Sequence, residues 1–137
     1  MITYNQIKQP EYKKWLTEYK AYLVENWGLN SDLAEKVAVF LLYAYFYGLN
    51  WTINSGFRDP EYQKELQKRW DAGNRTGIVA RPATNSLHSV TGWLSKPDSH
   101  AIDLKFNDQN LAGQLSPFFG LKWGGNFNSR DPVHFYV

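Results

Sequence analysis

The stretch from Val37 to Tyr47 most constrains the fold, because it is apolar on nearly every side. A helix with that pattern is stable only when other elements bury it all round. Ser31 or Asp32 can cap its start, with Glu35 as the capping-box partner of Asp32, and Gly48 follows its end. We therefore expect this helix at the centre of a helical layer.

Two more helices are expected on either side of it along the chain. Apolar residues recur at spacings of three and four in residues 11–27, which predicts a helix that Gly28 ends. Asp59-Pro60 is a favoured helix start, an N-cap acid followed by proline. The inner face of that helix is expected to carry Tyr62, Leu66 and Trp70.

Short segments later in the chain predict a sheet. Apolar or alternating stretches indicate strands at residues 49–54, 101–106, 118–123 and 133–137, with Ser55-Gly56 as a turn and a short helix at 108–115. Two helices, then a strand, a helix, a loop and several short strands are typical of an α+β fold. We expect a small antiparallel sheet of about four strands packed against the N-terminal helices.

Composition narrows the classes of protein and site. A chain of 137 residues that is 43% hydrophobic has the size and apolar content of one domain. We expect residues 1–30 to add an N-terminal helix to a core of residues 31–137. The absence of cysteine excludes disulfide scaffolds, thiol nucleophiles and cysteine-ligated zinc. A net charge of +2 with interspersed signs argues against a nucleic-acid surface.

All histidines of the chain lie in two short stretches, residues 86–103 and 131–134, that also carry aspartates. The residues concerned are His88, His100, His134, Asp98, Asp103 and Asp131. Two imidazoles and a carboxylate suit Zn²⁺ and leave a position for water, which a second carboxylate can deprotonate. Because single histidines in small domains are usually surface or core residues, the spacing alone leaves both interpretations open.

Strand geometry separates the candidates. In an extended strand His100 and Asp103 point to opposite faces, so His88 is the better partner for Asp103. Asp131 and His134 would also point apart in a fully extended chain, but Pro132 makes a bend plausible that brings both to one site. Arg58 stands at a strand-to-helix junction, where it could pair with a carboxylate or an oxyanion, or simply lie on the surface.

Five fragments in order resemble the zinc peptidases of bacterial cell-wall peptides. That family includes D-alanyl-D-alanine carboxypeptidases and dipeptidases and the L-alanyl-D-glutamate endopeptidases of phage endolysins. The resemblance covers roughly residue 33 to the end. The fragments are Ser55-Gly56-Phe57-Arg58 with Gln63, Ala80-Arg81-Pro82 with Ser86-Leu87-His88, Ala101-Ile102-Asp103-Leu104, Trp123-Gly124-Gly125, and Asp131-Pro132-Val133-His134-Phe135.

The resemblance implies roles for particular residues. It makes His88, Asp103 and His134 the zinc ligands on the face of the sheet and Asp131 the general base. It makes Arg58 the group that binds the substrate's carbonyl oxygen or carboxylate. Ser86 and Gln63 are lesser substrate-binding candidates, with ordinary loop and helix-surface hydrogen bonding as the alternative. The Trp-Gly-Gly fragment and an aspartate as base look most like the L-alanyl-D-glutamate endopeptidases.

One departure from the family is plain. His88 and Asp103 lie 15 positions apart, which is wider than the family's spacing, so residues 93–99 look inserted. This segment, which begins with Trp93 and is followed by His100, could be a lid over the cleft or a passive surface loop. His100 is the reserve ligand.

These observations favour a zinc-dependent peptidase acting on peptidoglycan stem peptides, most simply an L-alanyl-D-glutamate endopeptidase. The alternatives are a D-alanyl-D-alanine carboxypeptidase or dipeptidase, and a module that binds zinc or cell-wall peptide without cutting it. We expect a monomer without membrane insertion, since the longest apolar run is shorter than the ~20 residues that span a bilayer. No secretory signal is visible, so another system would deliver it, and an immunity or delivery partner cannot be read from the sequence.

Overall fold

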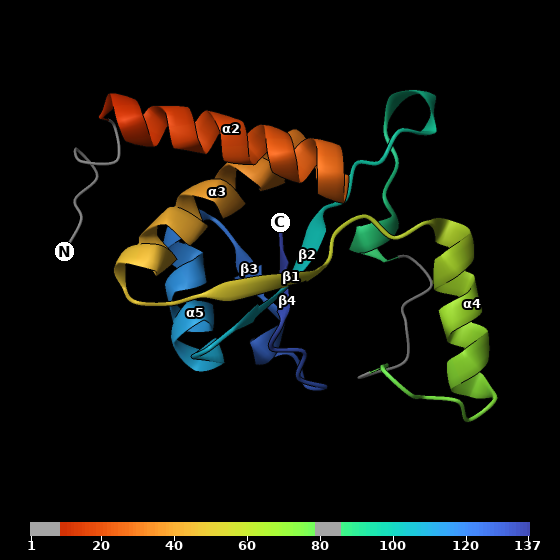
Figure 1. The fold of residues 1–137 in the computed structure, drawn as a ribbon. Helices are drawn as coiled ribbons and strands as arrows, with labels where there is room; N and C mark the ends of the chain where they lie inside the picture. Colours follow the sequence, from red (N-terminus) through yellow and green to blue (C-terminus); the bar gives the residue numbers. More distant parts are fainter. Residues whose placement is uncertain (1–8, 79–85) are drawn as a thin grey trace.

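The computed structural model describes residues 9–78 and 86–137 and has an α+β architecture (Figure 1). Its helices are α2 (Pro10–Trp27), α3 (Ser31–Phe46), α4 (Pro60–Asp71) and α5 (Gln109–Leu115). Its strands are β1 (Trp51–Ser55), β2 (Ala101–Phe106), β3 (Lys122–Trp123) and β4 (His134–Tyr136). The strands form one antiparallel sheet in the order β1-β2-β4-β3. The expected fold class is therefore confirmed.

Helix α3 is the centre of the core, as its apolar pattern predicts. It lies between α2 and the sheet, and the Phe40 ring packs against Phe106 of β2 and Phe135 of β4 with centroids 5.6 and 5.5 Å apart. Leu23 of α2 is fully buried on its other side and belongs to the same hydrophobic cluster. Burial ends in the last turn of α3, where Tyr45 is exposed. Because one continuous core joins α2, α3 and the sheet, the N-terminal helix is part of the domain.

The ends of the helices follow local capping chemistry, with one correction. Gly28 ends α2 in the left-handed conformation (φ 65°), and Asp59 caps α4 by accepting a hydrogen bond from Glu61 N–H. Helix α3, however, is capped by Asn30, whose side-chain oxygen accepts from Asp32 and Leu33 N–H, and not by Ser31 or Asp32. The cap therefore comes from the first of three consecutive residues that all favour this position.

Two other local expectations are only partly confirmed. On α4 the inner face carries Leu66 and Gln63, which is only 4% exposed, whereas Tyr62 is 54% exposed. Residues 118–123 do not form one strand, because a 3-10 helix (η3, Ser116–Phe119) begins beside Pro117 and Gly120 turns the chain at φ 77°. Only Lys122–Trp123 remain as strand β3.

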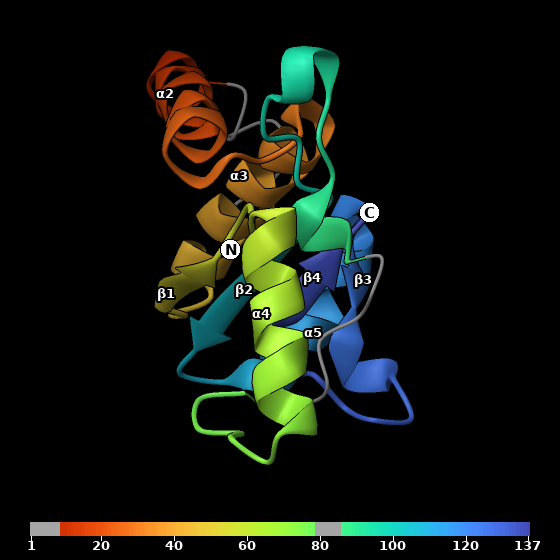
Figure 2. The ribbon, with the colours of Figure 1, turned by 90° about the vertical axis from the view of Figure 1, so that its right-hand side faces the viewer.

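One face of the sheet packs into the hydrophobic core, and the opposite face carries polar side chains. In β2, Ile102 and Leu104 are fully buried within the core cluster, whereas Asp103 points to the other face, and Asp103 pairs in register with His134 of β4. Beyond the sheet edge, α4 stands in front of β2 and β4 in the view of Figure 2. Within the described residues, no helix is long and apolar enough to cross a membrane.

Candidate metal centre

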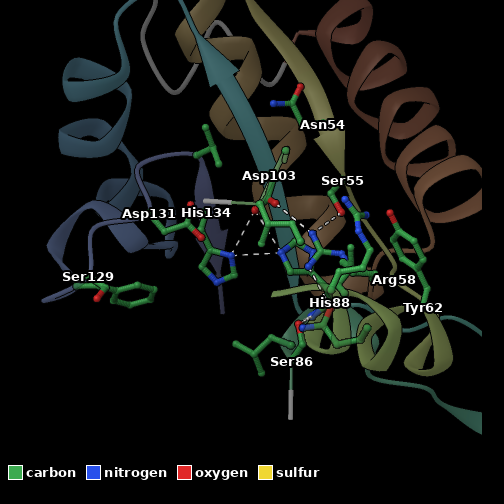
Figure 3. A pocket seen from close by; sticks show the side chains of 18 of the residues that line it. Asn54, Ser55, Arg58, Tyr62, Ser86, His88, Asp103, Ser129, Asp131 and His134 are labelled. Atoms are coloured by element: carbon green, nitrogen blue, oxygen red, sulfur yellow. Dashed lines mark hydrogen bonds and ion pairs between the residues drawn. The ribbon is translucent and has the colours of Figure 1, made fainter. Parts of the chain in front are cut away.

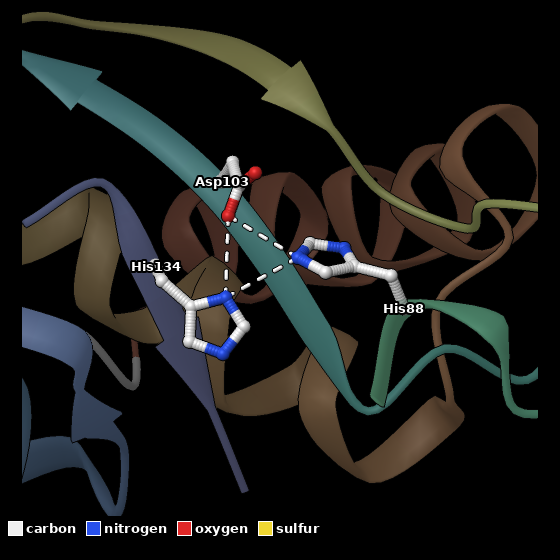
Figure 4. Close-up of side chains that lie close together, drawn as sticks. All are labelled: His88, Asp103 and His134. Atoms are coloured by element: carbon white, nitrogen blue, oxygen red, sulfur yellow. Dashed lines mark hydrogen bonds and ion pairs between the residues drawn. The ribbon is translucent and has the colours of Figure 1, made fainter. Parts of the chain in front are cut away.

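Three side chains from distant segments converge on the open face of the sheet (Figure 4). His88 comes from the 3-10 helix η1 (Leu87–Ser89), Asp103 from β2 and His134 from β4. His88 Nε2 lies 3.2 Å from His134 Nδ1 and 3.2 Å from Asp103 Oδ1, and His134 Nδ1 lies 3.3 Å from Asp103 Oδ1. These atoms form a nearly equilateral triangle and together could hold a metal ion.

The size of this triangle fits a small tetrahedral cation. Nitrogen and oxygen ligands about 2.0–2.1 Å from a tetrahedral Zn²⁺ lie roughly 3.3 Å from one another. The three observed separations of 3.2, 3.2 and 3.3 Å agree with that edge length. Two nitrogen donors and one carboxylate oxygen are also a donor set that zinc accepts, while Mg²⁺ and Ca²⁺ prefer oxygen alone.

The hydrogen bonding of His88 also favours a cation. Its Nδ1 donates to Gly56 O at 2.8 Å, which places the lone pair of the neutral ring on Nε2. Asp103 Oδ1 and His134 Nδ1 each lie 3.2 Å from that atom. A cation bound among the three would satisfy their lone pairs together, and the bond to Gly56 O is the outer-sphere contact typical of metal-bound imidazoles.

Electrostatics keep Asp103 ready to bind a cation. Burial opposes its ionisation, but hydrogen bonds and charge from His134 and His88 outweigh burial and hold the pKa of Asp103 well below its usual range. Its two oxygens have different partners. Oδ1 faces the imidazoles, and Oδ2 lies 3.5 Å from Arg58 Nη2. The carboxylate is therefore ionised and oriented at neutral pH.

Backbone contacts hold His88 in place. Ser86 caps η1 by accepting from His88 N–H at 3.2 Å, and Arg58 N–H donates to His88 O at 2.8 Å. Gly56 is required beneath the ring, since a Cβ there would lie 2.3 Å from Trp27 O. The Ser-Gly-Phe-Arg fragment thus connects the end of α2, the candidate ligand His88 and the guanidinium of Arg58.

The Trp-Gly-Gly fragment supports the other candidate ligands. Trp123 Nε1 and Gln109 Nε2 both donate to Pro132 O, at 2.7 and 2.6 Å, which fixes a turn before β4. Asp131 N–H donates to Gly124 O, and a Cβ on Gly124 would lie 2.5 Å from Asp131 O. The expected bend at Pro132 is therefore present, and Asp131 and His134 both face the same cavity.

The triad opens into a cavity of about 750 Å³ between the sheet and α4 (Figure 3). Arg58 lines it beside the triad, with Nη1 donating to Gln63 Oε1 (3.1 Å) and Nη2 donating to Ser55 Oγ (3.2 Å). Gln63 is buried, lines the cavity and contributes to the orientation of Arg58. Ser86 also lines the cavity.

Asp131 has the electrostatics of a proton acceptor. Burial raises its pKa, and the nearby charge of Asp103 raises it further, while the charges of His134, His88 and Arg58 act in the opposite direction. A carboxylate whose pKa is raised holds a proton more firmly, which suits general-base work near neutral pH. The residue thus combines a position in the cavity with a pKa above the ordinary carboxyl value.

A β-bulge adds residues that sequence reasoning missed. Ile53 pairs with Leu104, but the next paired residue is Ser55, opposite Asp103, so the register shifts at Asn54. Both Asn54 and Ser55 consequently line the cavity. Of the fragment expected as a turn, Ser55 is therefore the last residue of β1 and Gly56 lies in the bend that follows, and Ser55 contacts Arg58.

The inserted loop lies away from the cavity. Residues 90–98 form a projecting hairpin-like segment, with Thr91 bridged to Pro97, and its base is held by Asn30 Nδ2 donating to Asp98 Oδ1 at 3.0 Å. Trp93 at its tip is 82% exposed, and neither Trp93 nor His100 is among the described residues lining the cavity. His100 instead lies 3.8 Å from Asp98 Oδ2. The structure thus gives His100 no place among the candidate ligands, and the loop does not cover the cleft here.

Several cavity residues carried no chemical signal in the sequence. Asn54, Tyr62, Arg69, Phe127 and Ser129 line the cavity together with the expected residues. One sequence pattern does connect three of the helix residues in the lining. Tyr62, Leu66 and Arg69 are separated by four and three positions, which places them on a common face of a helix. The fragment Ala80-Arg81-Pro82 lies outside the described residues.

No protein-family model matches the sequence, and no curated protein matches it significantly.

Proposed function

We propose that this protein is a zinc-dependent peptidase that hydrolyses peptidoglycan stem peptides, with the L-alanyl-D-glutamate bond as its target. The observation that carries the proposal is the triangle of His88 Nε2, His134 Nδ1 and Asp103 Oδ1, whose edges of 3.2–3.3 Å match a tetrahedral zinc site. Asp131 and Arg58 line the same cavity. A pure binding module has no use for a carboxylate with a raised pKa beside such a centre.

The donor set favours zinc over other common metals. His88, His134 and Asp103 supply two nitrogens and one oxygen, which leaves a fourth tetrahedral position for water, as in catalytic zinc sites. A zinc ion held by these three residues would supply polarisation of a carbonyl group and a bound water whose pKa is lowered to ~7. The cavity gives this position access to a substrate of peptide size.

The chain's own residues supply the remaining groups for amide hydrolysis. Asp131 accepts the proton of the attacking water and passes it to the leaving amine. Arg58, already oriented by Gln63 and Ser55, donates hydrogen bonds to the carbonyl oxygen as negative charge develops on it. Its contact with Asp103 at 3.5 Å keeps the guanidinium beside the metal centre.

Support for a cell-wall substrate comes from the five motif fragments. The structure offers a physical reason for each described fragment: Gly56 and Arg58 support His88, Gly124 supports the turn at Asp131, and Asp103 pairs with His134. Since these are contacts within one site, the fragments act together. The choice of the L-alanyl-D-glutamate bond follows from the Trp-Gly-Gly fragment and from aspartate as base.

Digestion of purified peptidoglycan tests the proposal. Zinc-loaded wild type, wild type with a chelator, and Asp131→Asn would be compared, with the released fragments read by mass spectrometry. We expect chelator-sensitive fragments with new D-glutamate amino termini, reduced by roughly 10²–10⁴-fold in rate in Asp131→Asn. Asp32→Asn is the matched control, because Asp32 is an exposed carboxylate paired with Lys36 outside the cavity.

The fragments also separate the competing functions. Release of terminal D-alanine would identify a carboxypeptidase or dipeptidase. Zinc bound at one equivalent, with no bond cut in walls of different cross-link chemistry, would favour a binding module. Equal activity in wild type and Asp131→Asn would remove Asp131 as the base.

A further inference from the structure

The cavity extends well beyond the metal centre along one face of α4. Tyr62, Gln63, Leu66 and Arg69 all line it, which covers the helix from its first turn nearly to its last. Seven residues of α-helix rise ~10 Å, so Arg69 lies about that far along the groove from Tyr62. An extended peptide advances about 3.3 Å per residue, so this length corresponds to roughly three residues.

The two ends of this groove differ in charge. The described acidic residues that line it, Asp103 and Asp131, are both at the metal centre beside Arg58. At the other end Arg69 lines the cavity, and within the described residues no carboxylate forms an ion pair with it. With no such ion pair among the described residues, its guanidinium is available to attract an anionic group in the groove.

The guanidinium of Arg69 is also oriented. One of its nitrogens, Nη2, donates to Thr76 O at 3.1 Å, and its backbone carbonyl accepts from Asn74 N–H at 2.8 Å. A guanidinium has five N–H groups in a rigid fork, so one bond to a carbonyl fixes its direction without using its capacity for a carboxylate. Because the Arg69 side chain is half-buried and already makes a hydrogen bond, it loses less conformational entropy on binding a ligand than a mobile surface arginine does.

We propose that Arg69 binds a carboxylate of the substrate about three residues from the scissile bond, so that the groove selects acidic peptides. The position of the scissile bond in this inference rests on the proposed peptidase function. The carboxylate can belong to a side chain or to the end of the peptide. Both present the same two oxygens to the fork, and the test below separates them.

Binding of synthetic peptides tests the proposal. Zinc-loaded Asp131→Asn would be titrated calorimetrically with four N-acetylated peptides that begin L-alanyl-D-glutamyl-alanyl and carry a fourth residue. That residue is glutamate or glutamine, and the chain end is a carboxylate or an amide. We expect the best distal carboxylate to bind about tenfold tighter than the fully amidated peptide, with the ratio falling as salt rises.

Variants at neighbouring positions separate binding from a structural role. Arg69→Gln, which keeps a polar side chain but removes the charge, should abolish the carboxylate preference, and Arg69→Lys should keep part of it. Lys68→Gln removes an exposed cation of the same helix outside the cavity and should leave the preference unchanged. Thermal melting of each variant shows whether the fold is retained.

The outcomes decide the proposal independently of the peptidase function. An unchanged carboxylate preference in Arg69→Gln, or a lower melting temperature with no change in preference, would overturn it. If wild type cuts none of the peptides but the preference still depends on Arg69, the carboxylate site stands and the proposed peptidase function fails. Cleavage without any dependence on Arg69 removes the carboxylate site alone.

Discussion

The two walls of the cleft are held by different forces. The sheet wall carries Asp103 and His134 on paired strands whose opposite face packs Ile102, Leu104 and Phe135 into the core. The helix wall, α4, buries little besides Leu66 and Gln63. Two of the three candidate ligands therefore belong to strands that pack into the hydrophobic core. The cavity-lining residues of α4 belong to a helix with fewer buried apolar contacts.

This difference suggests a division of roles. A metal centre needs its donor atoms held to within a fraction of an ångström, which the paired strands provide. Selection of a peptide requires only groups placed along a groove, and changes on α4 can alter them without disturbing the core. Arg58 joins the walls, because it contacts Asp103 on the sheet and Gln63 on the helix.

The largest effect is expected from loss of a ligand on the sheet wall. His134→Ala should lower zinc affinity by more than the roughly 10–100-fold that loss of an outer hydrogen-bonding partner costs. Competition with a chromogenic chelator measures this affinity. His100→Ala is the matched control, since His100 pairs with Asp98 outside the cavity. A larger loss of affinity in His100→Ala than in His134→Ala would reverse the ligand assignment.

A smaller effect is expected when the support of the sheet wall is changed. Gly124→Ala places a Cβ 2.5 Å from Asp131 O and 2.9 Å from His134 Cβ, so the turn before β4 must shift. We expect zinc affinity to fall by roughly 10–100-fold, with a stability loss of about 1–3 kcal/mol from overpacking. Chelator competition and urea unfolding measure the two effects.

The control for this change is Gly92→Ala. A Cβ at Gly92 meets only ordinary contacts with Asp98 at 3.5 Å, in the loop that lies away from the cavity. It should leave zinc affinity unchanged. If Gly124→Ala behaved in the same way, the turn would tolerate displacement and the Trp-Gly-Gly fragment would not support the metal centre.

On the helix wall, Gln63→Met should affect turnover and not metal binding. The substitution keeps the buried volume but removes the acceptor of the Arg58 Nη1 hydrogen bond, so the guanidinium is less well oriented. We expect kcat/KM on the proposed substrate to fall by about tenfold, the scale of one hydrogen bond to a charged group. Gln67→Met makes the same chemical change one turn away and should retain activity. A fall in zinc affinity in Gln63→Met would contradict the separation of the two walls.

The same two walls differ in how well the sequence predicts them. The scarcity of imidazoles narrowed the candidates to a few residues, the resemblance to the zinc peptidases chose His88, Asp103 and His134 among them, and strand parity separated His100 from Asp103. The bend at Pro132 could be expected from the fixed geometry of proline. These predictions depend on rare residue types or on rules of backbone geometry.

Predictions failed where common residues depend on tertiary contacts. The bulge at Asn54 arises from the pairing of β1 with β2, so no local pattern marks it. Gln63 is buried because Arg58 and the sheet lie against it, although glutamine is usually exposed. Arg69 and Phe127 are ordinary residues until the fold places them around a cavity, and Asn30 was missed because Ser31 and Asp32 are equally good caps.

The smallest effect concerns stability, and it distinguishes two carboxylates of the same centre. The pKa of Asp131 is raised in the folded chain, so between the ordinary carboxyl pKa and the raised value the folded state holds more protons than the unfolded state, and stability falls as pH rises. The pKa of Asp103 is lowered, so its contribution is present above the ordinary value and is lost only in strong acid. Metal-free Asp131→Asn should therefore be more stable than wild type at pH 7, with a higher melting temperature. Asp103→Asn should be less stable at that pH.

Melting in the presence of a chelator at pH 4 and pH 7 measures both variants, and the stability advantage of Asp131→Asn over wild type should shrink at pH 4. An Asp131→Asn variant that is less stable than wild type at pH 7 would show that its carboxylate serves the fold more than the reaction.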